Sequence, residues 1–282
     1  MKIINSMLNI RNEIKIFKMQ GKSIGLVPTM GYLHEGHLSL MRKAREENDI
    51  VVISIFVNPT QFGEDEDLDT YPRDLERDSK LAKEVGVDIV FTPSVEEMYP
   101  KGYTTYVEVE GEITNKLCGK SRVGHFKGVT TIVSKLFNIV TPDRAYFGQK
   151  DAQQVAVIQK MVRDLNFDIE IIPCPIVRED DGLALSSRNT YLSSSERNDA
   201  KVISQSLFKA EQMIKNGERD VEKIRQFIIN KIDLVETSEI DYVEIVNAET
   251  LRDINEIKGD VLIALAVKIG KTRLIDNIRL EV

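Results

Sequence analysis

Apolar runs separated by amphipathic stretches dominate the first part of the chain. The segments "SIGLVPT" (23–29) and "DIVVISIFVNPT" (49–60) are apolar and rich in β-branched residues, which is typical of buried strands in a parallel sheet. Between them, "HLSLMRKAREEN" (37–48) has the periodicity of an amphipathic helix. A strand, a helix and a second strand in this order predict a βαβ unit.

The same alternation continues to about residue 176, where the pattern changes. It predicts a Rossmann-like, doubly wound parallel sheet in a first domain of residues 1–176. Two amphipathic helices and hairpin-forming strands then predict a smaller α+β domain of residues 177–282. In the first domain we expect further helices over 74–86, 128–140 and 151–165, and strands over 87–93, 144–148 and 169–177. In the second we expect helices over 195–217 and 220–232 and strands within 240–251 and 260–280.

Two of the three histidines of the chain lie in "LVPTMGYLHEGHLSL" (26–40), where the first predicted strand passes into a helix. His34 and His37 are three residues apart and therefore share a helix face. A helix N-terminus offers N–H groups to an anion, and Gly31 and Gly36 allow close approach. This pattern predicts a phosphate site with two imidazole donors. The alternatives are a helix start that carries two histidines, or a zinc site, which lacks further ligands at suitable spacing nearby.

Three further polar clusters combine side chains suited to a small anionic substrate. Amides bind a hydroxyl or carboxylate without adding charge, Lys and Arg pair with phosphate, and a carboxylate accepts from a ribose hydroxyl. Each cluster alone is also typical of an ordinary turn, but two of them, like the histidines, close predicted strands. The clusters are Asn58 and Gln61 in "FVNPTQF", Lys150, Asp151 and Gln154 in "FGQKDAQQ", and Ser186, Ser187 and Arg188 in "GLALSSRN".

Composition limits the partners of the chain. The net charge is −7, from 38 basic and 45 acidic residues, which argues against binding to nucleic acid. The N-terminal segment does not resemble a signal peptide, and no apolar run is long enough to span a membrane, so we expect a cytoplasmic protein. Cys118 and Cys174 are then expected to be reduced. His125, in "GHFKGVTT", is expected to be a core or helix-start histidine.

Six motifs occur in order between about residues 22 and 192: "PTMGYLHEGH", "FVNPTQF", "YPR", "GHFKGV", "FGQKDAQQ" and "LSSRN". Together they resemble the pantothenate synthetase family of the nucleotidyltransferase superfamily, whose signature is H-x-G-H. The resemblance implies condensation of pantoate with β-alanine, driven by ATP with Mg²⁺. A pantoyl adenylate would be the intermediate, and AMP and pyrophosphate would be released. It also implies a homodimer, and we expect residues 177–282 to form a lid over the site.

The resemblance assigns roles to individual residues. The resemblance offers Asp78 as a ligand of the magnesium ion, although Arg77 stands beside it where some members carry a second acid. The catalytic residues would be His34, His37, Lys150 and Arg188, and the substrate contacts Met30, Asn58, Gln61 and Gln154. The ATP contacts would be Pro28, Met30, His34, His37, Gly148, Lys150, Asp151, Val177, Leu185, Ser186, Ser187 and Arg188.

Three other functions compete with this interpretation. A nucleotidyltransferase that acts on a phosphate acceptor would share the histidine motif, but it would need more Arg and Lys than Gln61 and Gln154 provide. A non-catalytic nucleotide-binding regulator would not need both Lys150 and Arg188 beside the histidines. A tRNA-charging enzyme is disfavoured by the net acidity and by the absence of a basic anticodon-binding region.

Overall fold

The computed structural model describes residues 1–64 and 66–282, which form two compact units. The first unit comprises Met1–Val109, Arg122–Gln149 and Val157–Pro175. The second comprises Glu110–Ser121, Lys150–Ala156 and Ile176–Val282, so it draws on three separate stretches of the sequence. The predicted boundary between residues 176 and 177 and the lid role of residues 177–282 stay predictions.

A six-stranded sheet forms the centre of the first unit, and every pair of neighbouring strands in it is parallel. The chain runs from β2 outward to β3 and β4 and later returns to β5 on the other side of β2. This reversal is the switch point of a doubly wound sheet, where ligands bind at the carboxyl ends of the strands. The predicted fold class is confirmed. The strand order is β1 (Lys2–Ile4), β4 (Ile89–Phe91), β3 (Ile50–Ile55), β2 (Ile24–Thr29), β5 (Arg144–Gly148) and β6 (Glu170–Cys174).

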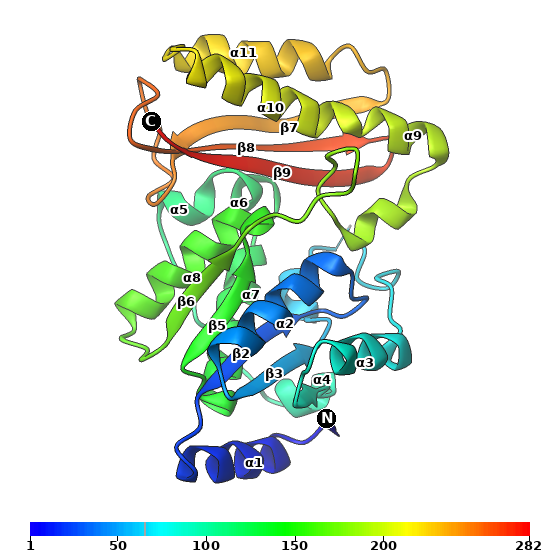
Figure 1. Cartoon of the computed structure of the whole chain (residues 1–282), viewed down its shortest axis with the longest axis vertical. Coiled ribbons are helices and arrows are strands. Elements are labelled where there is room, and N and C mark those ends of the chain that lie inside the picture. The colour runs from blue at the N-terminus through cyan, green and yellow to red at the C-terminus, as the bar shows by residue number, and fades with distance from the viewer. Residues whose placement is uncertain (65) are drawn as a thin grey trace. The chain divides into compact units, whose positions relative to one another are not determined.

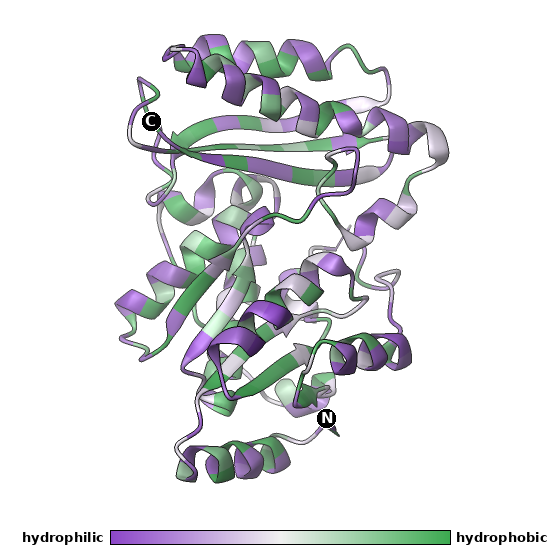
Figure 2. Cartoon of the chain, viewed as in Figure 1, coloured by the Kyte–Doolittle hydropathy of each residue, from purple (hydrophilic) through white to green (hydrophobic). Residues whose placement is uncertain are grey.

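Amphipathic helices cover the strands of this sheet (Figure 1). Helix α2 packs on β2, β3 and β5, and α7 packs on β2 and α1. The strands are mostly apolar in Figure 2, as expected for strands buried on both faces. The helices are α1 (Met7–Met19), α2 (Glu35–Glu47), α3 (Leu75–Glu84), α4 (Val95–Met98) and α7 (His125–Val140), with the 3₁₀ turn η1 (Pro59–Gln61). The 3₁₀ turn η2 (Gln149–Asp151) and helix α8 (Ala152–Asp164) are divided between the units, because residues 150–156 belong to the second.

The sequence did not predict the elements that precede "SIGLVPT". Strand β1 has 3 residues, too few for a periodic pattern to be recognised. Strand β6 ends at Cys174, earlier than expected, and contains Pro173. Because β6 is an edge strand, Pro173 is tolerated although it has no N–H to donate.

An antiparallel sheet in the order β7-β8-β9 forms the second unit together with α10 and α11, which lie along it in Figure 1. This confirms the predicted α+β character. The helix expected over 195–217 is interrupted at Ala200, which separates α9 from α10. The elements are α5 (Glu112–Asn115), α6 (Cys118–Ser121), η3 (Ser187–Tyr191), α9 (Ser194–Asp199), α10 (Lys201–Lys215), α11 (Val221–Ile232), β7 (Ser238–Asn247), β8 (Asp260–Ile269) and β9 (Thr272–Glu281).

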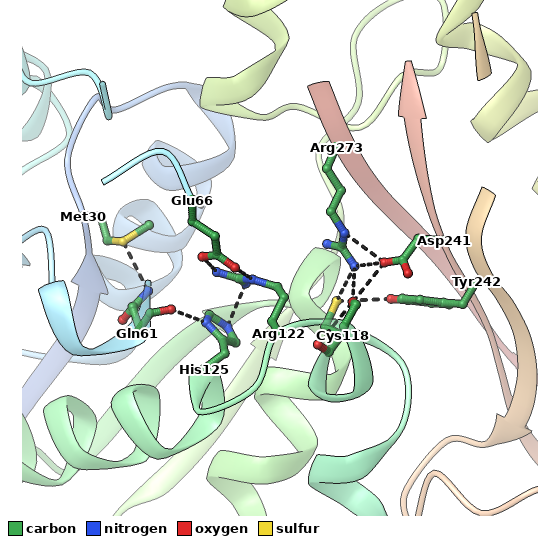
Figure 3. Close-up of polar contacts among 10 residues, drawn as sticks. Met30, Gln61, Glu66, Cys118, Arg122, His125, Asp241, Tyr242 and Arg273 are labelled. Carbon is green, nitrogen blue, oxygen red and sulfur yellow. Dashed lines mark hydrogen bonds and ion pairs between the residues drawn. The ribbon is translucent and has the colours of Figure 1, made fainter. Parts of the chain in front are cut away.

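A polar cluster joins the short helix α6 to the sheet of the second unit (Figure 3). The Cys118 Sγ atom lies 3.3 Å from the Tyr242 hydroxyl. The Arg273 guanidinium donates to Asp241 at 2.7 Å and lies 3.5 Å from the same sulfur. Cys118 and Cys174 are both free and buried. No helix in the described part of the chain has the length and apolar character needed to cross a membrane.

Candidate active site

The turn after β2 adopts a backbone conformation that requires support from elsewhere. Gly31 and Tyr32 both have positive φ, at 85° and 50°. A Cβ at position 31 would lie 2.9 Å from Ile55 Cγ2 and 3.0 Å from Asp78 Oδ2, so glycine is needed there for both conformation and space. This turn connects β2 to the histidines at the start of α2.

Asp78, at the start of α3, holds the turn in place. Its two carboxylate oxygens each accept a backbone hydrogen bond of 2.7 Å, from Tyr32 and Leu33. The side chain is 1% exposed, and this burial raises the pKa of the carboxyl although the two N–H groups oppose the shift. The contacts give Asp78 a structural role, and its role as a metal ligand stays a prediction.

His34 and His37 lie together at the first turn of α2, with ring centroids 4.0 Å apart. His34 is the N-cap of the helix, and its Nδ1 accepts from Gly36 N–H at 3.2 Å. The Nδ1 of His37 accepts from His34 N–H at 3.3 Å. In a neutral imidazole, an Nδ1 that accepts leaves the proton on Nε2. Both rings therefore carry an Nε2–H donor, as a phosphate site requires.

Asn58 and Gln61 bracket the 3₁₀ turn η1 after β3. The Asn58 amide nitrogen lies 3.1 Å from Gln61 Oε1, and the Gln61 amide nitrogen contacts Met30 Sδ at 3.3 Å. Asn58 is 1% exposed, and its oxygen accepts from Tyr99 at 2.7 Å and from Thr60 at 3.0 Å. Asn58 thus contacts the Gln61 side chain directly, and its predicted substrate-binding role stays a prediction.

Two other predicted contacts lie on the strands at the switch point. Pro28 is in β2 and pairs in register with Ser54 of β3. Gly148 ends β5, and an added Cβ there would meet no atom within 4 Å. The sheet of the first unit thus brings the carboxyl end of β2, the histidine turn and the end of β5 to one edge.

The remaining predicted residues belong to the second unit, and several of them are held by its sheet. The main-chain carbonyl of Lys150, in η2, accepts from the Asn277 amide of β9 at 2.9 Å. Asp151 is exposed and Gln154 is half-buried. Gln153, which the sequence analysis did not single out, is buried and anchors the start of α8 through the carbonyls of Ile113 and Lys116.

A short hairpin brings Val177 and Leu185 together. The Leu185 N–H donates to the Val177 carbonyl at 3.0 Å. The hairpin leads directly into Ser186, the N-cap of η3, whose hydroxyl accepts from Arg188 N–H at 3.3 Å. Leu185, Ser186 and Arg188 therefore follow one another on a loop of defined conformation.

Arg178 fixes this hairpin to the sheet of the second unit. Its guanidinium forms an ion pair with Asp276 at 2.6 and 2.9 Å and also donates to the Gly182 carbonyl at 3.0 Å. Asp276 is 2% exposed, and burial raises its pKa against the opposing effect of Arg178. Sequence reasoning missed Asp276, Asn277 and Arg178 because they lie outside recognisable motifs.

No cluster of three or more His, Cys, Asp or Glu side chains suited to a metal occurs among residues 1–64 and 66–282. Both oxygens of Asp78 already accept backbone hydrogen bonds. These residues therefore do not form a protein cage for Mg²⁺. That ion commonly keeps several waters and binds substrate phosphates with only one or two carboxylates.

Comparisons with known proteins identify the family of the chain. The family model of pantoate-β-alanine ligases matches residues 2–279. The chain belongs to this family. It is an enzyme of the pantothenate synthetase type, as the motifs implied.

Individual relatives cover the whole chain. The pantothenate synthetase of Acetivibrio thermocellus is 65% identical over 282 residues, with 100% of both chains covered. That of Caldicellulosiruptor saccharolyticus is 58% identical with the same coverage. The crystal structure of pantothenate synthetase from Thermus thermophilus has a TM-score of 0.94 at 45% identity and covers 99% of each chain. The structure of a Francisella tularensis pantoate-β-alanine ligase, complexed with β-γ ATP and β-alanine, has a TM-score of 0.81 at 38% identity. The match covers 99% of this chain and 97% of that ligase chain.

Proposed function

We propose that this protein condenses pantoate with β-alanine to pantothenate at the expense of ATP, through a pantoyl adenylate, and releases AMP and pyrophosphate. The observation that carries the proposal is the paired histidine turn. His34 and His37 present two Nε2–H donors from adjacent rings at a helix N-terminus, an arrangement suited to phosphate oxygens that gain charge during reaction.

In the first half-reaction, a pantoate carboxylate oxygen attacks the α-phosphorus of ATP and the bond to pyrophosphate breaks. The carboxylate is ionised at neutral pH, so this step needs no general base. Catalysis then depends on positioning and on stabilisation of charge. We assign the phosphates to His34, His37, Lys150 and Arg188, and pantoate to Gln61 and Gln154.

In the second half-reaction, the β-alanine amine attacks the acyl carbon of pantoyl adenylate, the bond to AMP breaks, and the amine loses a proton. Pyrophosphate has left by this stage. Lys150 and Arg188 therefore act mainly in the first step.

We propose that Mg²⁺ enters with ATP, held by phosphate oxygens and water. When bound, it would neutralise phosphate charge, and we assign no step to it. We further propose that the enzyme acts in the cytoplasm as a homodimer, with no nucleic-acid or membrane partner. The net charge of −7 supports the absence of a nucleic-acid partner, and sedimentation analysis would test the dimer.

ATP–pyrophosphate exchange tests the proposed function. We expect exchange that depends on pantoate, and amide formation when β-alanine is added. Phosphorylated acceptors serve as the matched alternative substrates. Exchange with these acceptors and not with pantoate would favour the rival nucleotidyltransferase function.

A further inference from the structure

His125, which the sequence analysis left without a role in the reaction, contacts the segment that carries Gln61. It is the first residue of α7 and is 8% exposed. Its Nδ1 lies 2.8 Å from the main-chain carbonyl oxygen of Gln61, and its Nε2 lies 3.0 Å from Nη1 of Arg122 (Figure 3). The ring therefore bridges a main-chain carbonyl and a guanidinium.

These two partners fix the position of the ring proton. A carbonyl oxygen only accepts hydrogen bonds, so Nδ1 must carry the hydrogen and donate to Gln61. A guanidinium only donates, so Nε2 must accept from Arg122. His125 is thus neutral, with the tautomer opposite to that of His34 and His37, whose Nδ1 atoms accept.

Glu66 holds the guanidinium that orients the ring. Arg122 donates to the two Glu66 carboxylate oxygens through Nε and Nη2, each at 2.6 Å. A bidentate pair of this kind restricts the guanidinium to one plane. The remaining Nη1 donates to Nε2 of His125. This contact and the hydrogen bond to Gln61 together fix the orientation of the ring.

Gly128, one turn further along α7, makes the second contact with the same segment. A Cβ there would lie 2.3 Å from the Thr60 carbonyl oxygen and 2.6 Å from Gln61 Cα. The Gly128 carbonyl also accepts from the Asn58 amide at 3.1 Å. The first turns of α7 therefore pack directly against the main chain at Thr60 and Gln61.

We propose that His125 is a positioning residue for pantoate: its Nδ1–H holds the Gln61 main chain so that the Gln61 amide meets the substrate in one orientation. This proposal rests on the proposed function, because it takes pantoate as the ligand of Gln61. Both ring nitrogens are engaged with protein atoms, so the ring acts through Gln61 and not on the reacting groups.

The tautomer can be measured directly in the unmodified protein. With ¹⁵N-labelled histidine, long-range ¹H–¹⁵N spectra distinguish a protonated ring nitrogen from an unprotonated one. The chain has 3 histidines, and the signals that disappear in His125→Asn belong to His125. We expect His125 to be protonated on Nδ1 alone at neutral pH, and the other two rings on Nε2. A His125 ring protonated on Nε2 alone, or on both nitrogens, overturns the proposal.

Kinetics of pantoate-dependent exchange test the consequence for the substrate. We expect His125→Ala to raise the KM for pantoate about tenfold, the effect of one lost hydrogen bond. The KM for ATP should change less than about twofold. Lys127→Ala, which removes a neighbouring exposed ion pair with Glu108, is the matched control and should leave both constants unchanged.

Two conservative variants separate the two contacts of the ring. The shorter amide of His125→Asn reaches the Nδ1 position and can donate to Gln61, whereas that of His125→Gln reaches the Nε2 position and faces Arg122. We expect the Asn variant to restore most of the pantoate KM and the Gln variant not to. Rescue by Gln alone, or an equal rise in the KM of both substrates, overturns the proposal.

The outcomes also separate this proposal from the proposed function. Wild-type protein without pantoate-dependent exchange would overturn the function and leave the tautomer result unaffected. Normal exchange with an unchanged pantoate KM in a folded His125→Ala would overturn the positioning role alone. Should the Ala and Gln variants fail to fold, the tautomer measured for the wild-type ring decides whether the positioning proposal holds.

Discussion

The side chain of Asn277 donates a hydrogen bond to the main-chain carbonyl of Lys150, which lies 127 residues earlier in the sequence. The residue beside it, Asp276, pairs with Arg178, whose guanidinium also holds the Gly182 carbonyl. Two consecutive residues of β9 thus anchor both segments of the second unit that carry proposed phosphate contacts.

Removal of the Asn277 side chain should therefore slow the first half-reaction. We expect Asn277→Ala to reduce pyrophosphate exchange about tenfold, because Lys150 loses one main-chain anchor in a site that depends on positioning. Arg279→Ala is the control on the same strand, where an exposed ion pair with Asp260 is lost. Similar rates for the two variants at equal thermal stability would contradict the anchoring role.

The paired histidines should each be needed for turnover. We expect His34→Ala and His37→Ala to lower kcat by about 10²–10³, the usual effect of losing one preorganised donor to a developing charge. Steady-state kinetics on folded protein would measure it. Retention of more than about half the activity would exclude the phosphate role, since donors of this kind rarely contribute so little.

Gln61 and Gln154 should discriminate between the two ligands of the first step. We expect Gln61→Ala and Gln154→Ala to weaken pantoate binding by roughly 1–3 kcal/mol, because substrate hydroxyl or carboxylate groups lose a partner. ATP binding should change much less. Titration calorimetry with each ligand separately gives the comparison, and equal weakening of both would refute the assignment.

Lys150 and Arg188 should matter mainly for the first half-reaction. We expect Lys150→Ala and Arg188→Ala to slow pyrophosphate exchange by about 10² or more, because each removes a charge-assisted contact to phosphate. With preformed pantoyl adenylate, the same variants should form pantothenate with a much smaller defect. Single-turnover quench-flow measures both steps.

Two outcomes of that experiment would contradict the division. Equal defects would mean that Lys150 and Arg188 hold the nucleotide throughout, or maintain the fold. A defect confined to amide formation would place them at the amine.

Tyr99, which donates to Asn58, should make the free energy of unfolding depend on pH in the alkaline range. Burial raises the pKa of Tyr99 to about 12, from an ordinary value of 10.0, and its hydroxyl donates to Asn58. Between these values the unfolded chain has released the proton and the folded chain retains it, so the free energy of unfolding falls as pH rises. Urea unfolding from pH 9 to 11 should show a smaller decline for Tyr99→Phe than for wild type. Parallel curves would show that Tyr99 does not contribute.

The sequence predicted those parts of the structure whose signal is local. The histidine turn follows from a strand and a helix with clear periodicity, and β5 occupies the residues expected for it. The break at Ala200 was not predicted because no proline or glycine marks it between residues 195 and 216. Helix α1 also has an amphipathic pattern, with Ile10 and Ile14 buried, although the sequence analysis predicts no helix there.

The contacts that position the site could not be predicted, because they join residues remote in sequence. Asp78 is hydrogen-bonded to Leu33, 45 residues earlier in the sequence, and His125 to Gln61, 64 residues earlier. Asn58 shows the opposite difficulty. Its residue type and place at a strand end favour a ligand contact, which stays a prediction, but no local pattern indicates its hydrogen bonds with Gly128 and Tyr99.

The second unit is built from three separate stretches of the sequence, so no single continuous fragment cut at the predicted domain boundary contains all of it. A fragment starting at residue 177 would expose Arg273 where Cys118 and Ser121 now cover it, and would leave Asn277 without Lys150. Restoring those contacts by fragment complementation would require two short peptides, 110–121 and 150–156, to be supplied in trans. Excision at the apparent boundary in the sequence would thus separate the C-terminal elements from residues on which their buried polar groups depend.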